Sequence, residues 1–280
     1  MKIAIAQMAP SVGKLEDNLE KHRQFINRAL EAGAELVVFP ELSLTGYELY
    51  DLVPEVAIKE GHPIMEELKG LSREIPFFTG FVLEEKDLFF NAAGFFKEGR
   101  LVHTHRKVFL PNYSMFEEKR FFAEGENFRA FEDKDLGIVG VLICYDYLHP
   151  SSSYLYFLQQ VDLLVVLSAS PARGYPDKGY PSIAMWENMS KVVSKHFTTY
   201  VVYANRVGFD GGMAFGGGSH AYSPTGDPLV RLRDLEEDLG FFEYRREELR
   251  RARVLFPAYR DERPWVIYRE IRRILNEDKS

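Results

Sequence analysis

The 280-residue sequence contains a single cysteine, Cys144, which excludes an internal disulfide framework. It also has no apolar run close to the roughly 18 residues that a membrane-spanning helix needs. The apolar stretch at its start, MKIAIAQMAP, is too short for a signal peptide. We therefore expect a cytoplasmic protein, in which Cys144 is either a buried small side chain or a reactive thiol.

Excess charge is small as well, because 35 Lys and Arg residues oppose 42 Asp and Glu residues and leave a net charge of −7. Acidic residues accompany the basic ones even in the Arg-rich C-terminal segment, so we expect no nucleic-acid partner. Hydrophobic residues make up 46% of the chain, which is enough for a substantial core. Because no linker, repeat or low-complexity stretch is visible, we predict one domain over residues 1–280.

Short apolar runs alternate with amphipathic segments along most of the chain. Apolar periodicity predicts helices near residues 14–33, 62–74, 150–160 and 181–196. Strands are predicted at residues 3–8, 35–40, 76–83, 88–96, 100–108, 136–144, 162–170 and 198–205. This alternation predicts an α/β architecture with mostly buried sheets.

The last 45 or so residues, about 236–280, differ from the rest because they are rich in Arg and Glu. Apolar residues recur there at helical spacing, at Trp265, Tyr268, Ile271 and Ile274. We predict that this tail forms a strand and a helix that pack on a second subunit.

Cys144 follows the continuously apolar run GIVGVLI, and His149 and Pro150 open the next predicted helix. A strand-to-helix turn of this kind places its side chain at the carboxyl edge of the sheet, where α/β proteins bind ligands. Neighbouring backbone N–H groups at such a turn would also favour the thiolate. The alternative is that Cys144 only fills space at the end of a core strand.

A thiol nucleophile needs a base, and it needs a cationic or N–H-bearing group that stabilises the oxyanion. Glu41 directly follows the apolar run ELVVFP, where a carboxylate requires a charged partner or a raised pKa. Lys107 follows the alternating strand LVHTHR, on the face that His103 and His105 share. Each charge could be a solvated strand end, but three such residues after three strands indicate a catalytic site.

Three motifs resemble the Glu, Lys and Cys motifs of the nitrilase superfamily of carbon–nitrogen hydrolases, in the same order: FPELSLTGY with Glu41, HRKVFLPNYSMFEEKRFF with Lys107, and LICYDYLHP with Cys144. The resemblance covers about residues 1–235. It implies a four-layer α-β-β-α sandwich, a homodimer or higher homo-oligomer, and no metal or cofactor. LTGYELYDLV, SASPARG and YANRVGFDGG are further similar to the glutaminase domain of glutamine-dependent NAD synthetases.

The resemblance also assigns roles to residues. Glu41 would take the proton of Cys144, whose sulfur attacks an amide carbon, while Lys107 and the backbone N–H of Tyr145 hold the oxyanion. Ammonia would leave, and water activated by Glu41 would hydrolyse the thioester. A match to F-x-E-x-R-F-F makes Glu118, rather than Glu117, the second glutamate, which would position Lys107 and the substrate. The alternative is that Glu118 belongs to an exposed charge cluster.

Loops that follow the catalytic motifs are expected to line the substrate pocket. Arg173 could pair with a substrate carboxylate through two parallel hydrogen bonds. The other candidates could equally be structural loop residues. The expected pocket residues are Tyr47, Asn112, Tyr113, Phe116, Ser168 and Arg173.

Two histidine arrangements and one glycine-rich run offer rival chemistry. His103 and His105 share a strand face, but no third ligand has suitable spacing, so we expect no metal site. His149 could pair with Cys144, yet the residue before a proline is held extended, and we expect it to point away. The run from Gly208 to Gly226 lacks the Lys-Ser/Thr of a phosphate loop and is predicted to form hairpin turns.

The favoured function is therefore hydrolysis of a small linear amide with release of ammonia. A second hypothesis is a glutaminase subunit that supplies ammonia to a separate NAD synthetase-type partner, because the chain has no SGGxDS-type ATP loop. A silent binding protein is a third, and the presence of all three site residues argues against it. Tyr145 stands where we expect an acidic residue in the synthetase-like family, so a carbamoyl or nitrile substrate stays open.

Overall fold

The computed structural model describes residues 1–174 and 179–275. Its first six-stranded sheet has the order β14-β1-β2-β3-β4-β5. These strands are β1 (Lys2–Gln7), β2 (Leu36–Val38), β3 (Phe77–Glu85), β4 (Leu88–Lys97), β5 (Arg100–Arg106) and β14 (Asp238–Glu243). The second six-stranded sheet has the order β13-β12-β9-β8-β7-β6. Its strands are β6 (Phe131–Asp133), β7 (Gly137–Ile143), β8 (Leu163–Ser168), β9 (Tyr200–Asn205), β12 (His220–Tyr222) and β13 (Pro228–Arg231).

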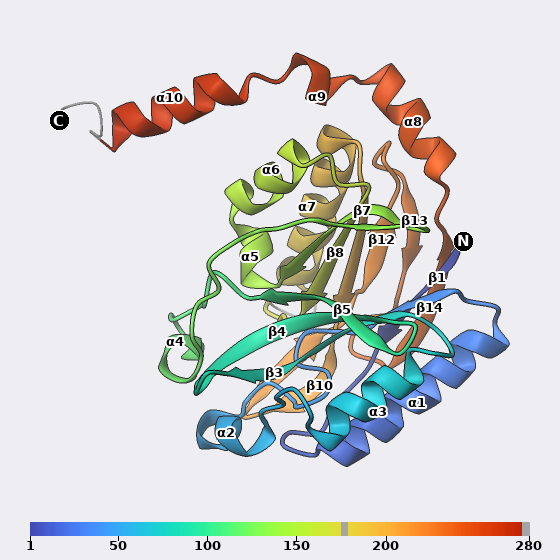
Figure 1. Ribbon diagram of the computed structural model, residues 1–280, viewed down its shortest axis with the longest axis vertical. Coiled ribbons are helices and arrows are strands. Elements are labelled where there is room, and N and C mark those ends of the chain that lie inside the picture. The colour runs from blue at the N-terminus through green and yellow to red at the C-terminus, as the bar shows by residue number, and fades with distance from the viewer. Residues whose placement is uncertain (175–178, 276–280) are drawn as a thin grey trace.

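Helices cover the outer face of each sheet (Figure 1). Helices α1 (Leu15–Glu31) and α3 (Pro63–Leu71) lie on the first sheet, and α6 (Pro150–Leu158) and α7 (Pro181–Phe197) lie on the second. The other helices are a 3₁₀ turn (Tyr50–Leu52), α2 (Val53–Val56), α4 (Glu118–Phe121), α5 (Tyr145–Leu148), α8 (Arg246–Leu255), α9 (Ala258–Asp261) and α10 (Pro264–Ile274).

The strand alternation explains why the two sheets stack. In β1, Ile3 and Ile5 belong to the core between the sheets, whereas Ala4 and Ala6 belong to the core under the helices. Both sets are fully buried. This confirms the four-layer α-β-β-α sandwich.

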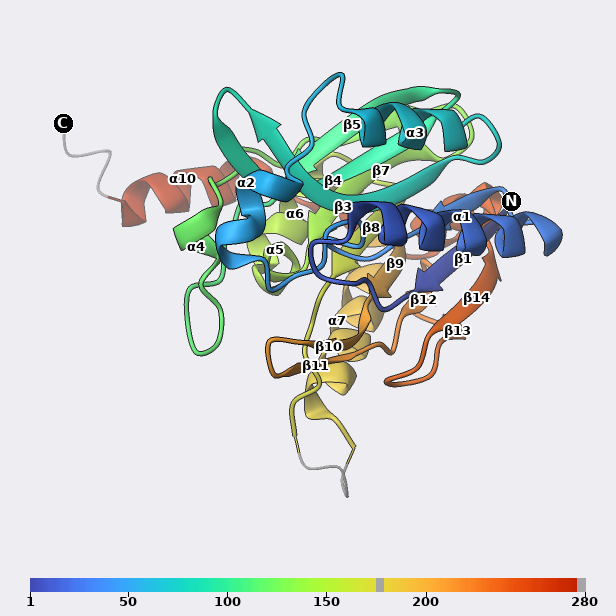
Figure 2. The ribbon, with the colours of Figure 1, turned by 90° about the horizontal axis from the view of Figure 1, so that it is seen from below.

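Two strands that lie far apart in the sequence, β1 and β14, are neighbours in the first sheet. Strand β1 pairs in parallel with β2 and antiparallel with β14, where Lys2 lies opposite Glu243. The N–H of Tyr244 also donates to the Met1 carbonyl at 2.8 Å. From there, α8, α9 and α10 run along one end of the molecule, and α10 projects past it (Figures 1 and 2).

Every strand and helix predicted between residues 3 and 205 is present, with small shifts at the ends. The glycine-rich run forms a hairpin of β10 (Val207–Asp210) and β11 (Met213–Gly216), as predicted. The tail contains a strand and helices, also as predicted. None of the helices in residues 1–174 and 179–275 is long and apolar enough to cross a bilayer.

Candidate active site

Cys144 occupies the sharp turn between β7 and α5. Its φ of 42° and ψ of −96° lie in a region that non-glycine residues rarely adopt. Its amide N–H donates to the Leu167 carbonyl at 2.8 Å, which fixes the turn against β8. The next amide, that of Tyr145, opens α5 and so has no acceptor within that helix. The turn therefore places a thiol and a free backbone donor at the same sheet edge.

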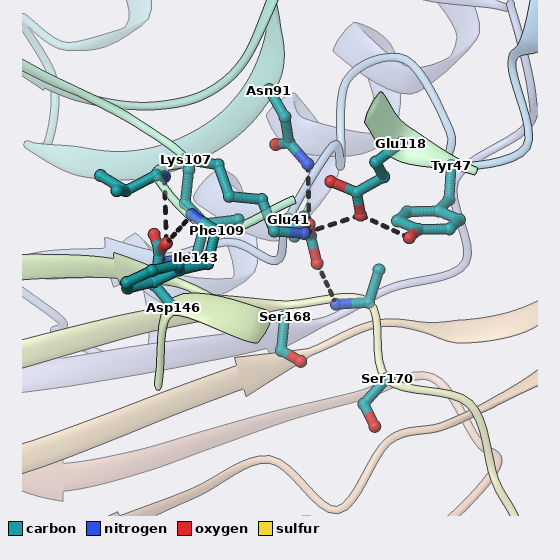
Figure 3. A network of polar contacts seen from close by, with 12 residues as sticks. Glu41, Tyr47, Asn91, Lys107, Phe109, Glu118, Ile143, Asp146, Ser168 and Ser170 are labelled. Atoms are coloured by element: carbon teal, nitrogen blue, oxygen red, sulfur yellow. Dashed lines mark hydrogen bonds and ion pairs between the residues drawn. The ribbon is translucent and has the colours of Figure 1, made fainter. Parts of the chain in front are cut away.

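Glu41 lies in the loop after β2 and is fully buried. Its Oε1 accepts hydrogen bonds from Lys107 Nζ at 2.7 Å and from Asn91 Nδ2 at 2.8 Å. Its Oε2 accepts the backbone N–H of Ala169 at 2.7 Å. Figure 3 shows Glu41 between these partners, which come from both sheets. The carboxylate is thus held in one orientation without exposure to solvent.

Glu118 is the second carboxylate on Lys107 (Figure 3). Its Oε1 accepts from Lys107 Nζ at 2.7 Å and from the Tyr47 hydroxyl at 2.5 Å. Its Oε2 is buried and has no hydrogen-bond partner among the described residues. Glu118 is only 5% exposed, so the alternative of an exposed cluster member is wrong. That description fits Glu117, which is exposed and pairs with Arg120.

Burial has the largest effect on the pKa of the Cys144 thiol. It raises the pKa of Cys144 to about 12; negative Glu41 raises this pKa further, while Lys107 and Ser168 lower it. Burial thus acts against the thiolate, in the opposite direction to the effect expected of the backbone N–H groups at the turn. A pKa in this range keeps the thiol protonated near neutral pH.

The ion pair between Lys107 and Glu118 raises the pKa of Lys107 and lowers the pKa of Glu118. Burial lowers the pKa of Lys107, but Glu118 and Glu41 outweigh it, so that this pKa lies above its ordinary value. Burial raises the pKa of Glu118 to about 7; Lys107 opposes this rise and Glu41 adds to it. Lys107 is consequently a permanent cation, whereas Glu118 titrates near neutral pH.

A cavity of about 90 Å³ opens beside Cys144, and four expected pocket residues line it: Tyr47, Tyr113, Phe116 and Arg173. The guanidinium of Arg173 lies over the Phe116 ring, 5.2 Å from its centroid. Its Nε and Nη2 are buried and have no hydrogen-bond acceptor within residues 1–174 and 179–275. The same cavity is therefore lined by the residue that carries the thiol, Cys144, and by Arg173, which has buried N–H groups without an acceptor among the described residues.

Two expected pocket residues do not line this cavity, although Ser168 hydrogen-bonds to the Cys144 thiol. Asn112 is exposed on the loop after Lys107. Ser168 is fully buried at the end of β8, where its Oγ accepts the Tyr203 hydroxyl at 2.9 Å. Neither lines the cavity, whereas Ser170, two residues further on, does.

A family model for carbon–nitrogen hydrolases matches residues 2–254. The chain belongs to the carbon–nitrogen hydrolase family. It is accordingly a hydrolase of non-peptide C–N bonds with the fold of the nitrilase superfamily.

Relatives with known names agree with this family. The chain is 31% identical over 257 residues to a glutamine-dependent NAD(+) synthetase of Acinetobacter baylyi, covering 90% of the chain and 46% of the relative. It is 31% identical over 280 residues to a nitrilase of Pyrococcus abyssi, covering 96% and 100%. A carbon–nitrogen hydrolase of Helicobacter pylori has the same fold, with a TM-score of 0.84 at 20% identity over 94% of the chain and 95% of that protein. The chain spans about half the length of the synthetases.

Sequence reasoning missed the residue that joins the Lys and Cys loops of this carbon–nitrogen hydrolase. Asp146 is fully buried, and its Oδ1 accepts the backbone N–H groups of Val108 and Phe109 at 3.0 and 2.8 Å. Its Oδ2 accepts Ile143 N–H at 3.2 Å and His105 Nε2 at 2.9 Å. The sequence contains an indication of this role, because a carboxylate two residues after Cys144 must be paired if it is buried.

Asn91 was also missed, although it stands as the one strongly polar side chain in the apolar strand LFFNAAGFF. A fully buried amide in such a strand requires partners, and here it donates to Glu41. Its backbone carbonyl accepts the Lys107 N–H at 2.9 Å. Asn91 thus contacts both Glu41 and Lys107.

The histidines take structural positions. His105 contacts Asp146, and His103 stacks on Phe131 with ring centroids 4.4 Å apart. His149 is extended, with φ −89° and ψ 108°, and stacks on Phe109 at 3.7 Å. Within the described chain, no three His, Cys, Asp or Glu side chains gather closely enough to hold a metal ion.

Proposed function

We propose that this protein hydrolyses a small linear amide whose acyl chain ends in a carboxylate, with ammonia as the first product. One observation carries the proposal: Cys144 and Arg173 line a single cavity, and Nε and Nη2 of Arg173 are buried with no acceptor among the residues that the structure describes. A buried cation without an acceptor is costly unless a ligand supplies the anion. The ligand that satisfies both groups is an amide with a carboxylate at its far end.

The first half of the reaction forms a thioester. Glu41 takes the Sγ proton of Cys144, and the sulfur attacks the amide carbon. Lys107 Nζ and the Tyr145 N–H stabilise the negative charge that develops on the carbonyl oxygen. When the C–N bond breaks, protonated Glu41 returns the proton to the nitrogen, which leaves as ammonia.

The second half releases the acid. Glu41 takes a proton from water, the resulting hydroxide attacks the thioester carbon, and the C–S bond breaks with return of the proton to Cys144. Glu118 and Tyr47 do not transfer protons in this scheme. They hold Lys107 Nζ in place through contacts of 2.7 and 2.5 Å along the chain Lys107–Glu118–Tyr47. No metal or cofactor takes part in these steps.

Arg173 selects the acyl chain. Its planar guanidinium can bind a carboxylate through two parallel hydrogen bonds, and stacking on Phe116 already fixes its plane. The cavity volume of about 90 Å³ favours a short chain. Monoamides of short dicarboxylic acids and the side-chain amide of glutamine both meet these requirements.

A second candidate function is a glutaminase subunit that delivers ammonia to a separate synthetase. It is favoured by the likeness to glutamine-dependent NAD(+) synthetases, of which three bacterial examples are 30–31% identical to this chain. The chemistry at Cys144 would be the same. The difference lies in the fate of ammonia, which a partner would consume.

The test is ammonia release from matched pairs of amides: glutaramate and L-glutamine, each with a carboxylate, against butyramide, which has none. We expect turnover by the wild type but not by Cys144→Ala, and a kcat/KM at least about 100-fold higher for the carboxylate-bearing amides. Arg173→Met should remove this preference and leave butyramide turnover unchanged. Mass spectrometry of a rapidly quenched reaction should detect the acyl group on Cys144.

Three outcomes would contradict the proposal: turnover that survives Cys144→Ala, equal kcat/KM for glutaramate and butyramide, or a preference that Arg173→Met leaves intact. Turnover of glutamine alone, stimulated by an ATP-dependent synthetase added to the assay, would instead support the second function.

A further inference from the structure

The β10–β11 hairpin holds a buried ion pair that the proposed mechanism does not use. The hairpin lies outside the two six-stranded sheets (Figure 2). Arg206, directly before β10, and Asp210, at its end, are both buried, and Nη1 of Arg206 donates to Oδ2 of Asp210. Desolvation offsets most of the attraction within a buried ion pair, so such a pair is weak evidence for stabilisation. Its function is better sought in the groups that it orients.

Several contacts fix the position of Arg206. Its N–H donates to the Ser168 carbonyl at the end of β8 (3.1 Å), and its carbonyl accepts the Gly217 N–H (3.0 Å). Its Nη2 donates to the Pro10 carbonyl at 3.3 Å. The guanidinium also lies over the Phe215 ring, 4.1 Å from its centroid. The end of β8 and the loop after β1 thus set where Arg206 lies.

Asp210 connects Arg206 to the loop that carries Tyr47. Its Oδ2, which accepts from Arg206, also accepts the backbone N–H of Tyr47 at 3.3 Å. Residues 42–49, all of which the structure describes, contain no helix or strand that could supply another acceptor for this N–H. The Phe215 ring packs edge-to-face against the Tyr47 ring, with centroids 5.7 Å apart. Both the backbone and the ring of Tyr47 therefore contact the hairpin.

Tyr47 in turn contacts the groups of the active site. Its hydroxyl donates to Glu118 Oε1 at 2.5 Å, and the same oxygen accepts from Lys107 Nζ at 2.7 Å (Figure 3). Tyr47 also lines the cavity beside Cys144. A shift of the Tyr47 backbone would therefore withdraw a hydrogen-bond donor from Glu118.

We infer that Asp210 is a positioning residue of this hydrolase: oriented by Arg206, it holds Tyr47 where the Tyr47 hydroxyl meets Glu118. The inference rests on the proposed function, because its main effect is measured as amide turnover. Neither Arg206 nor Asp210 lines the cavity beside Cys144, and neither transfers a proton.

Two variants separate the hydrogen bonds of Asp210 from its charge. In Asp210→Asn, the amide oxygen can take the place of Oδ2 and accept from both Arg206 and Tyr47, so both hydrogen bonds survive. The double variant Arg206→Met/Asp210→Leu removes the pair without leaving an unpaired buried charge, which protects folding. It also removes the acceptor of the Tyr47 N–H.

Lys97→Met/Asp133→Leu is the matched control. It removes another largely buried ion pair, whose carboxylate also accepts a backbone N–H, that of Leu136 at 3.1 Å. This pair lies outside the active site. The control should lower stability and leave kcat within about twofold of the wild type.

Steady-state kinetics with glutaramate gives the main measurement. In Arg206→Met/Asp210→Leu, kcat should fall about three- to tenfold with a smaller change in KM, because Glu118 and Lys107 lose a fixed neighbour but Arg173 does not. Asp210→Asn should lower stability in urea and keep kcat within about twofold of the wild type, because its hydrogen bonds remain. A pair that only stabilised the fold would leave kcat unchanged in every variant.

A double-mutant cycle tests whether Asp210 acts through Tyr47. In a Tyr47→Phe background, the further change Arg206→Met/Asp210→Leu should reduce kcat by no more than about twofold, because the hydroxyl that Asp210 positions is already absent.

Hydrogen exchange gives a readout that needs no turnover. Mass spectrometry of a peptide that spans Tyr47 should show one amide that exchanges at least about tenfold faster in Arg206→Met/Asp210→Leu than in the wild type. The same amide should keep its wild-type rate in Asp210→Asn.

Four results would overturn the inference: an unchanged kcat in Arg206→Met/Asp210→Leu, a loss of kcat that adds fully to that of Tyr47→Phe, an unchanged exchange rate, or an equal loss of kcat in Asp210→Asn. The last result would assign the effect to the charge of Asp210. If the wild type turned over no amide, the proposed function would fail, whereas the exchange rate would still show whether Asp210 holds Tyr47.

Discussion

The first and the second sheet contribute side chains of different character to the candidate active site. The first sheet supplies Glu41, Lys107 and Asn91, which are buried and hydrogen-bonded to one another. The second sheet supplies the neutral groups Cys144 and Ser168. The paired charges Glu41 and Lys107 thus lie on one side of the site, and the uncharged thiol of Cys144 lies on the other.

Two buried carboxylates form hydrogen bonds between the two halves of the site. The N–H of Ala169, after β8, donates to Glu41, and Asp146, after β7, accepts the N–H groups of Val108 and Phe109. Both contacts use backbone groups of one sheet and a carboxylate of the other (Figure 3). Substitutions that act on one half, or on the connection, should consequently have different signatures.

The largest effect is expected when the charged half loses its cation. Lys107→Met leaves Glu41 and Glu118 buried without their shared partner, so we expect stability to fall by about 3–5 kcal/mol. We also expect kcat to fall at least about 1,000-fold, because the oxyanion loses a donor as well. Amide turnover and urea unfolding measure the two losses.

Lys97→Met is the control, because Lys97 also bridges two carboxylates, Asp133 and Asp135, but outside the active site. It should lower stability and leave kcat within about twofold of the wild type. Equal kcat values in Lys97→Met and Lys107→Met would contradict the placement of Lys107 at the reacting carbonyl.

The next effect concerns the connection between the halves. Asp146→Asn replaces one carboxylate oxygen with an NH₂ group that faces an existing N–H donor, so we expect a stability loss of about 1–3 kcal/mol. Because the Lys107 and Cys144 loops shift relative to each other, kcat should fall about 10–100-fold while KM changes little. Steady-state kinetics separates these two constants.

His105→Gln provides a graded control, because it disturbs only one of the four contacts of Asp146. Its effect on kcat should be smaller than that of Asp146→Asn. A loss of stability without any change in kcat for Asp146→Asn would show that the alignment does not depend on this residue.

The third effect is a change in pH dependence. Since the pKa of Glu118 lies at about 7 in the folded protein, above its ordinary value of 4.5, the folded state binds this proton more tightly than the unfolded state. The group therefore favours folding at low pH, and that contribution declines as pH rises from about 4.5 to 7. If ionised Glu118 holds Lys107, kcat/KM should rise with pH through about 7.

We call the rise of kcat/KM with pH through about 7 the acid limb of the pH profile. Glu118→Gln should abolish this acid limb, whereas Glu117→Gln, at the exposed neighbour, should preserve it. The measurement is kcat/KM from pH 5 to 9. An unchanged limb in Glu118→Gln would assign the titration to another group.

The smallest effect is expected for Tyr47→Phe. The Tyr47 hydroxyl donates to Glu118, and this contact lowers the pKa of the carboxyl group. Its removal should shift the acid limb to higher pH and reduce kcat by only a few fold, because Lys107 still contacts Glu118. The same pH profile tests this shift, and a move to lower pH would contradict it.

Much of the fold follows from the sequence because its strands and helices have clear periodicity. The runs IAIAQM, PFFTGFVL and DLLVVLSAS all form strands, and apolar spacing locates α1 and α7. Short strands such as β6 and β13 were not predicted, since three or four residues are too few to show a periodic pattern of apolar side chains. Their positions depend on pairing with β7 and β12, which is a property of the assembled sheet.

For the active site, the sequence indicates which side chains follow the strands but not which of them meet. Glu41, Lys107, Glu118 and Cys144 could be named from motifs. Asp146 could not be assigned a role, because its partners lie some 40 residues earlier in the other sheet. The raised pKa of Cys144 likewise depends on burial, which local sequence does not reveal.

The pairing of β1 with β14 has a consequence for the order of folding during synthesis. Strand β1 is synthesised long before the strand opposite Lys2–Gln7, which ends at Glu243. One edge of β1 stays unpaired until β14 has been made, and an open edge of this kind is prone to aggregation. Cells should therefore depend on chaperones for this protein more than its compact final form indicates.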